Sequence, residues 1–335
     1  MIIDSHSHPF GPSGYEVDYG YPIPSRWDLP PGADKAVKPL LERHLRVMDR
    51  LGIDKRVYVP LPPQSNDLVA EAISQYADRF YGFGYVYASK DPDKMERELD
   101  EMDRAVKELG LKGFKMYNMY SGINMGDPLF RPIFEKCNEL KVPIVLDCHI
   151  IARGFIPMDV AEEPEYHVSY AGLKGMRRDA HNPMRFVYSD VMDGLDDLVV
   201  VLVHFGGGLW FFKEWPGIHN DIRDKAFGVN WGGAPRERFE KFYYDTTHVA
   251  PLDTPYPPCP GGRPSMPEDW WFKLFIQLAG EDRILFGTDS TFYPEVVEQR
   301  TWRELNLIKN LDVDEEVKEK ILWKNAARIF RLDME

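Results

Sequence analysis

Short apolar runs alternate with longer amphipathic segments along this chain, and that alternation is the feature that most restricts its fold. Eight runs are candidate strands, at residues 1–4, 55–61, 80–87, 111–117, 142–148, 198–203, 239–247 and 283–288. Residues 91–110, between two of these runs, carry apolar side chains at helical spacing and stop at Gly110. Strands that alternate with helices form parallel sheets with right-handed crossovers. Eight such units close most economically into a (β/α)8 barrel, or TIM barrel.

The whole chain of 335 residues, 1–335, is predicted to be one barrel domain. Residues 314–330 repeat apolar side chains along one side and are expected to form the closing helix. Two stretches interrupt the alternation: residues 150–182, rich in charges and aromatics, and residues 249–271, rich in proline. Both follow strand ends, where barrels carry their active sites, so we expect these insertions at the C-terminal face of the strands to wall or cover a pocket. Flexible surface loops are the alternative.

The composition limits the partners of the chain. The net charge of −13, from 41 basic and 54 acidic residues, disfavours nucleic acid and anionic membranes as partners. It says little about a small-molecule substrate, which is the expected partner. The three cysteines have no metal-type spacing, and their odd number suits a reduced protein. We find neither a signal peptide nor an apolar stretch of membrane-spanning length, so a cytoplasmic location is expected.

Histidines and one aspartate follow four of the eight runs. His6 and His8 stand one residue apart, so in a strand they face the same side. His149, His204 and Asp289 follow the fifth, sixth and eighth runs. Each alone has an ordinary explanation, such as a hydrogen-bonded core histidine or a helix cap. Together at one barrel mouth they predict a catalytic site for a borderline divalent ion such as zinc, with an open position for water.

The same strand ends carry a family resemblance. The stretches DSHSH (4–8), DCHI (147–150), VLVHFGG (201–207) and ILFGTDS (284–290) resemble the amidohydrolase superfamily, in particular the branch that contains aminocarboxymuconate semialdehyde decarboxylase, aromatic-acid decarboxylases and lactone hydrolases. The resemblance spans nearly the whole chain. It implies that His6, His8, His149 and Asp289 bind one divalent metal ion, zinc or alternatively manganese. It also implies that His204 is catalytic rather than a firm ligand, and that Asp289 shuttles a proton as well.

The resemblance leaves the reaction open. Several decarboxylases of this branch replace the first histidine with glutamate, whereas this chain keeps His6, which permits both hydrolysis and decarboxylation. Our prediction is a metal-dependent hydrolase of a small, carboxylated or aromatic substrate, with metal-activated water as the nucleophile. The alternative is a non-oxidative decarboxylase, or carboxy-lyase, of an aromatic or unsaturated acid at the same site. A catalytically silent binding or scaffold barrel ranks last.

Three further residues are predicted to contact the substrate. Lys115 lies where two-metal members of the superfamily carry a bridging carboxylated lysine, but a substrate-facing or ion-paired lysine is favoured here. Arg153 can clamp a carboxylate in bidentate fashion, unless it lies in a solvated loop. Trp210 can supply a planar wall for a ring, although aromatic residues are more often part of a core. The resemblance is compatible with a homodimer, for which the sequence identifies no interface.

Overall fold

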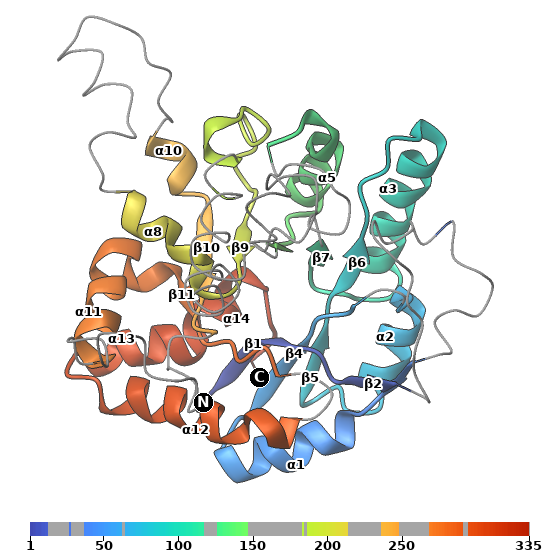
Figure 1. Cartoon of the computed structure of the whole chain (residues 1–335). Coiled ribbons are helices and arrows are strands. Elements are labelled where there is room, and N and C mark those ends of the chain that lie inside the picture. The colour runs from blue at the N-terminus through green and yellow to red at the C-terminus, as the bar shows by residue number, and fades with distance from the viewer. Residues whose placement is uncertain are drawn as a thin grey trace, which may run out of the picture.

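The computed structural model describes residues 1–12, 27, 37–61, 64–116, 126–146, 183, 186–213, 236–247, 268–290 and 294–334. Its parallel strands form a ring, seen in Figure 1. The strands are β1 (Ile3–Ser7), β4 (Lys55–Tyr58), β5 (Phe80–Gly82), β6 (Gly84–Val86), β7 (Phe114–Met116), β8 (Ile144–Leu146), β9 (Val200–Leu202), β10 (Phe242–Asp245) and β11 (Ile284–Leu285). Each of the eight predicted runs contributes to the ring, so the strand prediction is confirmed.

The third predicted run forms two strand segments. β5 pairs with β4, and β6 pairs with β7, each in parallel. Phe83 separates the two segments, yet its backbone N–H donates to the carbonyl of Tyr58 at 2.9 Å, and the N–H of Gly84 donates to the carbonyl of Gly113 at 2.8 Å. The run therefore passes from the sheet β1-β4-β5 to the sheet β6 to β11 without leaving the ring.

The ring closes between its first and last strands. The N–H of Ser5 donates to the carbonyl of Phe286 at 2.8 Å, and the N–H of His8 donates to the carbonyl of Ser290 at 2.7 Å. Ser7 and Ser290 also form a parallel bridge. These bonds join β1 to the end of β11, and the predicted (β/α)8 barrel is confirmed.

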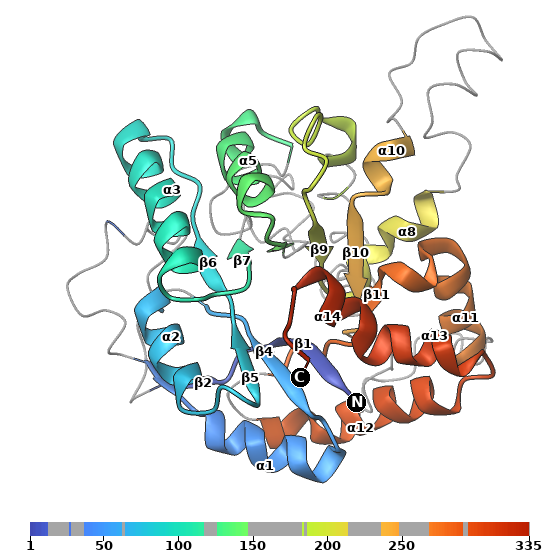
Figure 2. The same cartoon turned by 180° about the vertical axis from the view of Figure 1, so that it is seen from behind.

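Helices surround the ring, and α14 (Asn325–Ile329) lies across one end of it (Figures 1 and 2). The helices around the ring include α1 (Leu41–Leu51), α2 (Asn66–Ser74), α3 (Pro92–Lys107), α5 (Arg131–Leu140), α8 (Leu209–Phe212), α10 (Arg236–Phe239), α11 (Glu268–Ala279), α12 (Pro294–Asn310) and α13 (Glu315–Glu319). α3 lies within the predicted segment 91–110 and begins after Asp91, whose side chain caps it. The predicted closing helix is present as α13, a π-helical turn (Lys320–Lys324) and α14.

One strand pair was not predicted, and most of the two predicted insertions lies outside the described residues. An antiparallel pair, β2 (Phe10–Pro12) with β3 (Val37–Pro39), was not predicted. The insertion 150–182 lies outside the described residues, as does 249–271 except for its last residues, which begin α11. Among the described residues, no helix combines the length and apolarity needed to cross a membrane.

Apolar side chains fill the interior of the ring at one end. Ile3, Val57, Val145 and Val201 from four strands join a buried cluster with residues of α14 and the chain after it. Phe330, directly after α14, packs edge-on against Phe83 with ring centroids 5.0 Å apart. Figure 2 shows α14 beside β1 at this end. Since this end is filled, the opposite end, where the strands terminate, is left for polar side chains.

Candidate metal centre

His6 and His8 lie at the end of β1 and their rings converge. Both side chains are buried, and their Nε2 atoms are 3.1 Å apart. The ring planes are nearly perpendicular, at 84°. The Nδ1 atom of His8 donates to the carbonyl of Val59 at 2.7 Å. His8 therefore carries its proton on Nδ1, and Nε2 is the atom that can bind a metal.

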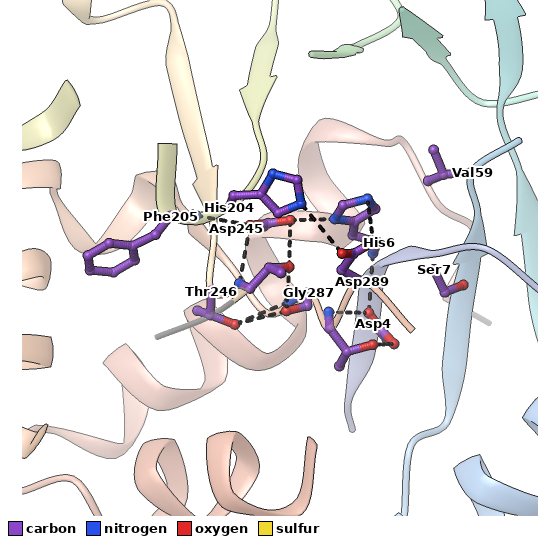
Figure 3. Close-up of polar contacts among 12 residues, drawn as sticks. Asp4, His6, Ser7, Val59, His204, Phe205, Asp245, Thr246, Gly287 and Asp289 are labelled. Atoms are coloured by element: carbon purple, nitrogen blue, oxygen red, sulfur yellow. Dashed lines mark hydrogen bonds and ion pairs between the residues drawn. The ribbon is translucent and has the colours of Figure 1, made fainter. Parts of the chain in front are cut away.

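His6 has the same arrangement through a buried carboxylate. Its Nδ1 atom donates to Asp245 Oδ2 at 2.8 Å, across 239 residues of sequence (Figure 3). Burial raises the pKa of Asp245, but the hydrogen bond from His6 and the neighbouring imidazoles outweigh it and hold that pKa below its ordinary value. Burial also lowers the pKa of His6, which keeps the ring neutral at neutral pH. Asp245 thus fixes the His6 tautomer with Nε2 free.

Asp245 was not predicted from the sequence. It stands in YYDTT at the end of β10, a strand that was predicted, but no histidine or spacing in the sequence marks it as a partner of His6. The available signal is its position, because an acidic residue at a barrel strand end points toward the same mouth as the other strand-end residues.

Asp289 brings a carboxylate to both imidazoles. Its Oδ1 atom lies 3.2 Å from His8 Nε2 and 3.6 Å from His6 Nε2, and its side chain is 22% exposed. Burial raises the pKa of Asp289, but the neighbouring imidazoles of His204, His8 and His6 outweigh it and hold the pKa well below its ordinary value. Its φ of 49° is rare for a residue other than glycine and marks a position that the surroundings must hold in place.

His204 reaches the same carboxylate from a left-handed turn after β9. Its Nε2 atom lies 3.5 Å from Asp289 Oδ2 (Figure 3). His204 and Phe205 have φ values of 56° and 59°, and the three glycines that follow also have positive φ. At Gly206 a Cβ atom would lie only 2.3 Å from the ring of Tyr244. The turn therefore requires glycine there for both conformation and space.

The donor atoms at this mouth fit one divalent ion. His6, His8 and Asp289 each offer one ligand atom, and all three atoms lie within 4.8 Å of one another. Bonds of about 2.0–2.2 Å at octahedral to tetrahedral angles separate ligand atoms by about 2.8–3.6 Å. The separations of 3.1, 3.2 and 3.6 Å fall in that range. Two neutral imidazoles with a carboxylate suit zinc or manganese, and three ligands leave positions for substrate.

The remaining predicted site residues have different placements. His149 and Arg153 lie outside the described residues. Lys115 is fully buried in β7, and its charge helps to lower the pKa of His6, after the larger effect of burial. The indole of Trp210 is also fully buried and donates to the carbonyl of Phe205 at 3.1 Å. This position under the His204 turn favours a packing role for Trp210 over the predicted substrate contact.

Known proteins resemble this chain along most of its length. The sequence model of the amidohydrolase family matches residues 3–332. The chain is 25% identical over 278 residues to 2-amino-3-carboxymuconate-6-semialdehyde decarboxylase of Dictyostelium discoideum, across 80% of this chain and 66% of that protein, slightly under two thirds of its length. It is 25% identical over 325 residues to gamma-resorcylate decarboxylase of Polaromonas sp. strain JS666, across 87% of each.

A solved structure agrees with the barrel. The dihydroxybenzoic acid decarboxylase of Polaromonas sp. JS666, determined with bound manganese and the inhibitor 2-nitroresorcinol, has a TM-score of 0.68 against this chain. The two are 22% identical, and the comparison covers 100% of this chain and 98% of the other. The predicted family resemblance is confirmed. The predicted hydrolase is wrong, because both curated relatives are decarboxylases. The strand-end histidines and aspartate suit both hydrolysis and decarboxylation, so these residues alone do not distinguish the two reactions.

Proposed function

The chain belongs to the amidohydrolase family, and from this premise we propose that it is a metal-dependent carboxy-lyase that removes carbon dioxide from a small aromatic or unsaturated acid. The observation that carries the proposal is the convergence of His6, His8 and Asp289 on one point, with His204 against the same carboxylate. The decarboxylase activity of both curated relatives supports the reaction type.

In this proposal His6, His8 and Asp289, together with the predicted ligand His149, hold one manganese or zinc ion. When bound, the ion supplies positive charge that orients the substrate's carboxylate or phenolate oxygen and stabilises negative charge. The manganese in the related Polaromonas structure supports a divalent ion. We assign Lys115, and the predicted Arg153, to binding of a substrate carboxylate.

Decarboxylation requires one proton at carbon. The bond between the ring or alkene carbon and the carboxylate breaks, its electron pair stays on that carbon, and carbon dioxide leaves. His6 and His8 are not suited to supply the proton, because each Nδ1–H is already donated inside the protein. The pair of His204 Nε2 and Asp289 Oδ2, 3.5 Å apart, can hold the proton and pass it to the carbon. Asp289 is partly exposed, so solvent can replace the proton after each turnover.

The test is an assay of protein loaded with manganese or zinc against hydroxybenzoates and unsaturated amino acids that carry an extra carboxylate. In deuterium oxide we expect one carbon dioxide per product and one deuterium on the carbon that lost it. The His6→Ala variant should lose this activity. Glu135→Gln, which alters an exposed ion pair with Arg131 on α5, serves as the control and should keep it. Product that contains oxygen-18 from labelled water, without release of carbon dioxide, would overturn the proposal.

A further inference from the structure

Asp4 ties together the two strands that carry the candidate ligands. It is fully buried in β1. Its Oδ1 atom accepts hydrogen bonds from the N–H of Thr288 at 3.0 Å and from the N–H of His6 at 3.2 Å. Its Oδ2 atom accepts from the hydroxyl of Thr288 at 2.7 Å. The carboxylate of Asp4, labelled in Figure 3, thus holds the backbone of His6 on β1 and the residue directly before Asp289.

A buried arginine holds Asp4 from the other side. Arg56 of β4 is fully buried, and its Nε atom lies 2.9 Å from Asp4 Oδ2. Its Nη1 atom lies 2.8 Å from Nδ1 of His44 on α1. A carboxylate with an opposite charge and three donors around it has one favourable position. Asp4 is therefore a fixed point rather than a mobile side chain.

The chain around Asp289 is fixed on both sides. The carbonyl of Thr288 accepts a hydrogen bond from Arg300 of α12, and the carbonyl of Ser290 accepts one from the N–H of His8 at 2.7 Å. Asp289 itself has the unfavourable φ of 49°. Such a backbone conformation persists only where neighbouring contacts over-determine it. The Asp4–Thr288 contacts join the histidine strand to the residue before Asp289, and the His8–Ser290 bond joins it to the residue after.

We infer that Asp4 is a positioning residue that sets the separation between the imidazoles of β1 and the carboxylate of Asp289, and so sets the affinity of this centre for its divalent ion. The inference rests on the metal centre of the proposed function. The ligand atoms are separated by 3.1 to 3.6 Å, and a slip of either strand end would change those separations directly. Groups that orient metal ligands typically contribute about 10- to 100-fold to metal affinity.

The test uses Thr288, because Asp4→Asn would leave Arg56 as an uncompensated buried charge and threaten the fold. Thr288→Val keeps the shape of the side chain but removes the hydroxyl that Asp4 accepts from, whereas Thr288→Ser keeps the hydroxyl. The dissociation constants of manganese and zinc ions alone are measured for the full chain by competition with a chromophoric chelator. We expect Thr288→Val to bind about tenfold more weakly than the wild type. Thr288→Ser should bind close to the wild type.

Asn325→Ala is the matched control, because Asn325 holds the other end of the same strand, β11. Asn325 of α14 donates to the carbonyls of Ile284 at 2.9 Å and Glu281 at 2.8 Å, at the start of β11 and away from the ligands. Urea unfolding with a chelator present gives the stability of each variant without metal. Unchanged binding by Thr288→Val, or an equal loss in Asn325→Ala at equal destabilisation, would overturn the role of Asp4. Failure of the wild type to bind either ion would instead overturn the metal centre, and the inference with it.

Discussion

Asp245→Asn changes one atom of the group that holds His6, and we expect it to weaken metal binding strongly. Asp245 Oδ2 accepts from His6 Nδ1 at 2.8 Å, and Oδ1 accepts from the backbone N–H groups of Phe205 at 3.4 Å and Thr247 at 3.2 Å. An amide that turns its NH₂ group toward His6 forces the imidazole proton onto Nε2, where it blocks the metal. The opposite orientation turns the NH₂ group toward two buried N–H donors. That orientation keeps the His6 proton on Nδ1 but costs two hydrogen bonds rather than one, so we expect the first orientation.

The size of the effect follows from the hydrogen bond that is lost. A hydrogen bond to a charged group contributes about 1.5–3 kcal/mol, which corresponds to a change of about 10- to 150-fold in an equilibrium constant. Partners of metal-binding histidines affect affinity by about 10- to 100-fold, the same range. We therefore expect the dissociation constant for manganese or zinc to rise about 10- to 100-fold in Asp245→Asn.

The measurement combines metal competition with nitrogen-15 NMR of the imidazoles, which reports the position of the His6 proton. Thr247→Val is the control, because its hydroxyl donates to the same carboxylate at 3.0 Å while the acceptor for His6 is kept. It should change the affinity far less. Equal affinity of Asp245→Asn and the wild type would refute the reasoning. A weakened site in which His6 still carries its proton on Nδ1 would refute the proposed cause.

Three other predictions concern the fold and the thiol chemistry. Gly206→Ala should reduce the free energy of unfolding, measured in urea, far more than Gly52→Ala. Both glycines have a left-handed φ, but only the new methyl group at position 206 would collide with Tyr244. Equal losses of stability in the two variants would contradict this prediction. The pKa of Asp103 is held below its ordinary value by hydrogen bonds from two lysines, so its contribution to stability is complete above about pH 4 and is lost as the pH falls through the folded pKa. In Asp103→Asn the thermal midpoint should therefore fall less steeply below that pH. The same fall in the variant and the wild type would argue against a role for the ion pairs with Lys107 and Lys136. Cys137 is fully buried, and burial raises the pKa of its thiol. Iodoacetamide at about pH 8 should therefore modify Cys137 only after denaturation, which peptide mass spectrometry can show. Rapid labelling of the native protein would contradict this prediction.

The strands were predictable from the sequence where they lie in short apolar runs that are buried on both faces, as β8 and β9 do. β8, Ile144–Leu146, lies inside the run at 142–148. The π-helical turn at Lys320–Lys324 was not predictable, since a single wide turn barely alters the apolar period of the segment. The β2–β3 pair was also missed, because its short segments contain glycine and proline and show no alternation.

The candidate site was predictable where strand ends carry metal-ligating residue types. His6, His8 and Asp289 met that description, and the structure brings their ligand atoms together. Asp245 also stands at a strand end but was missed, because its role as the partner of His6 exists only in relation to a ring 239 residues away. The reaction type could not be predicted from the residues, since the same imidazoles and carboxylate serve attack by water and protonation of carbon.

The bonds between β1 and β11 also have a consequence for biosynthesis. Asp4 and Thr288 are 284 positions apart, and a ribosome that adds 5–20 residues per second needs about 14–57 s to span that interval. Until then the amino-terminal strand has no neighbour on one edge, and the ion-binding cluster is incomplete. The metal ion can therefore bind only after the eighth strand has been synthesised. A nascent chain that stops earlier exposes an unpaired β-strand edge to chaperones or proteases.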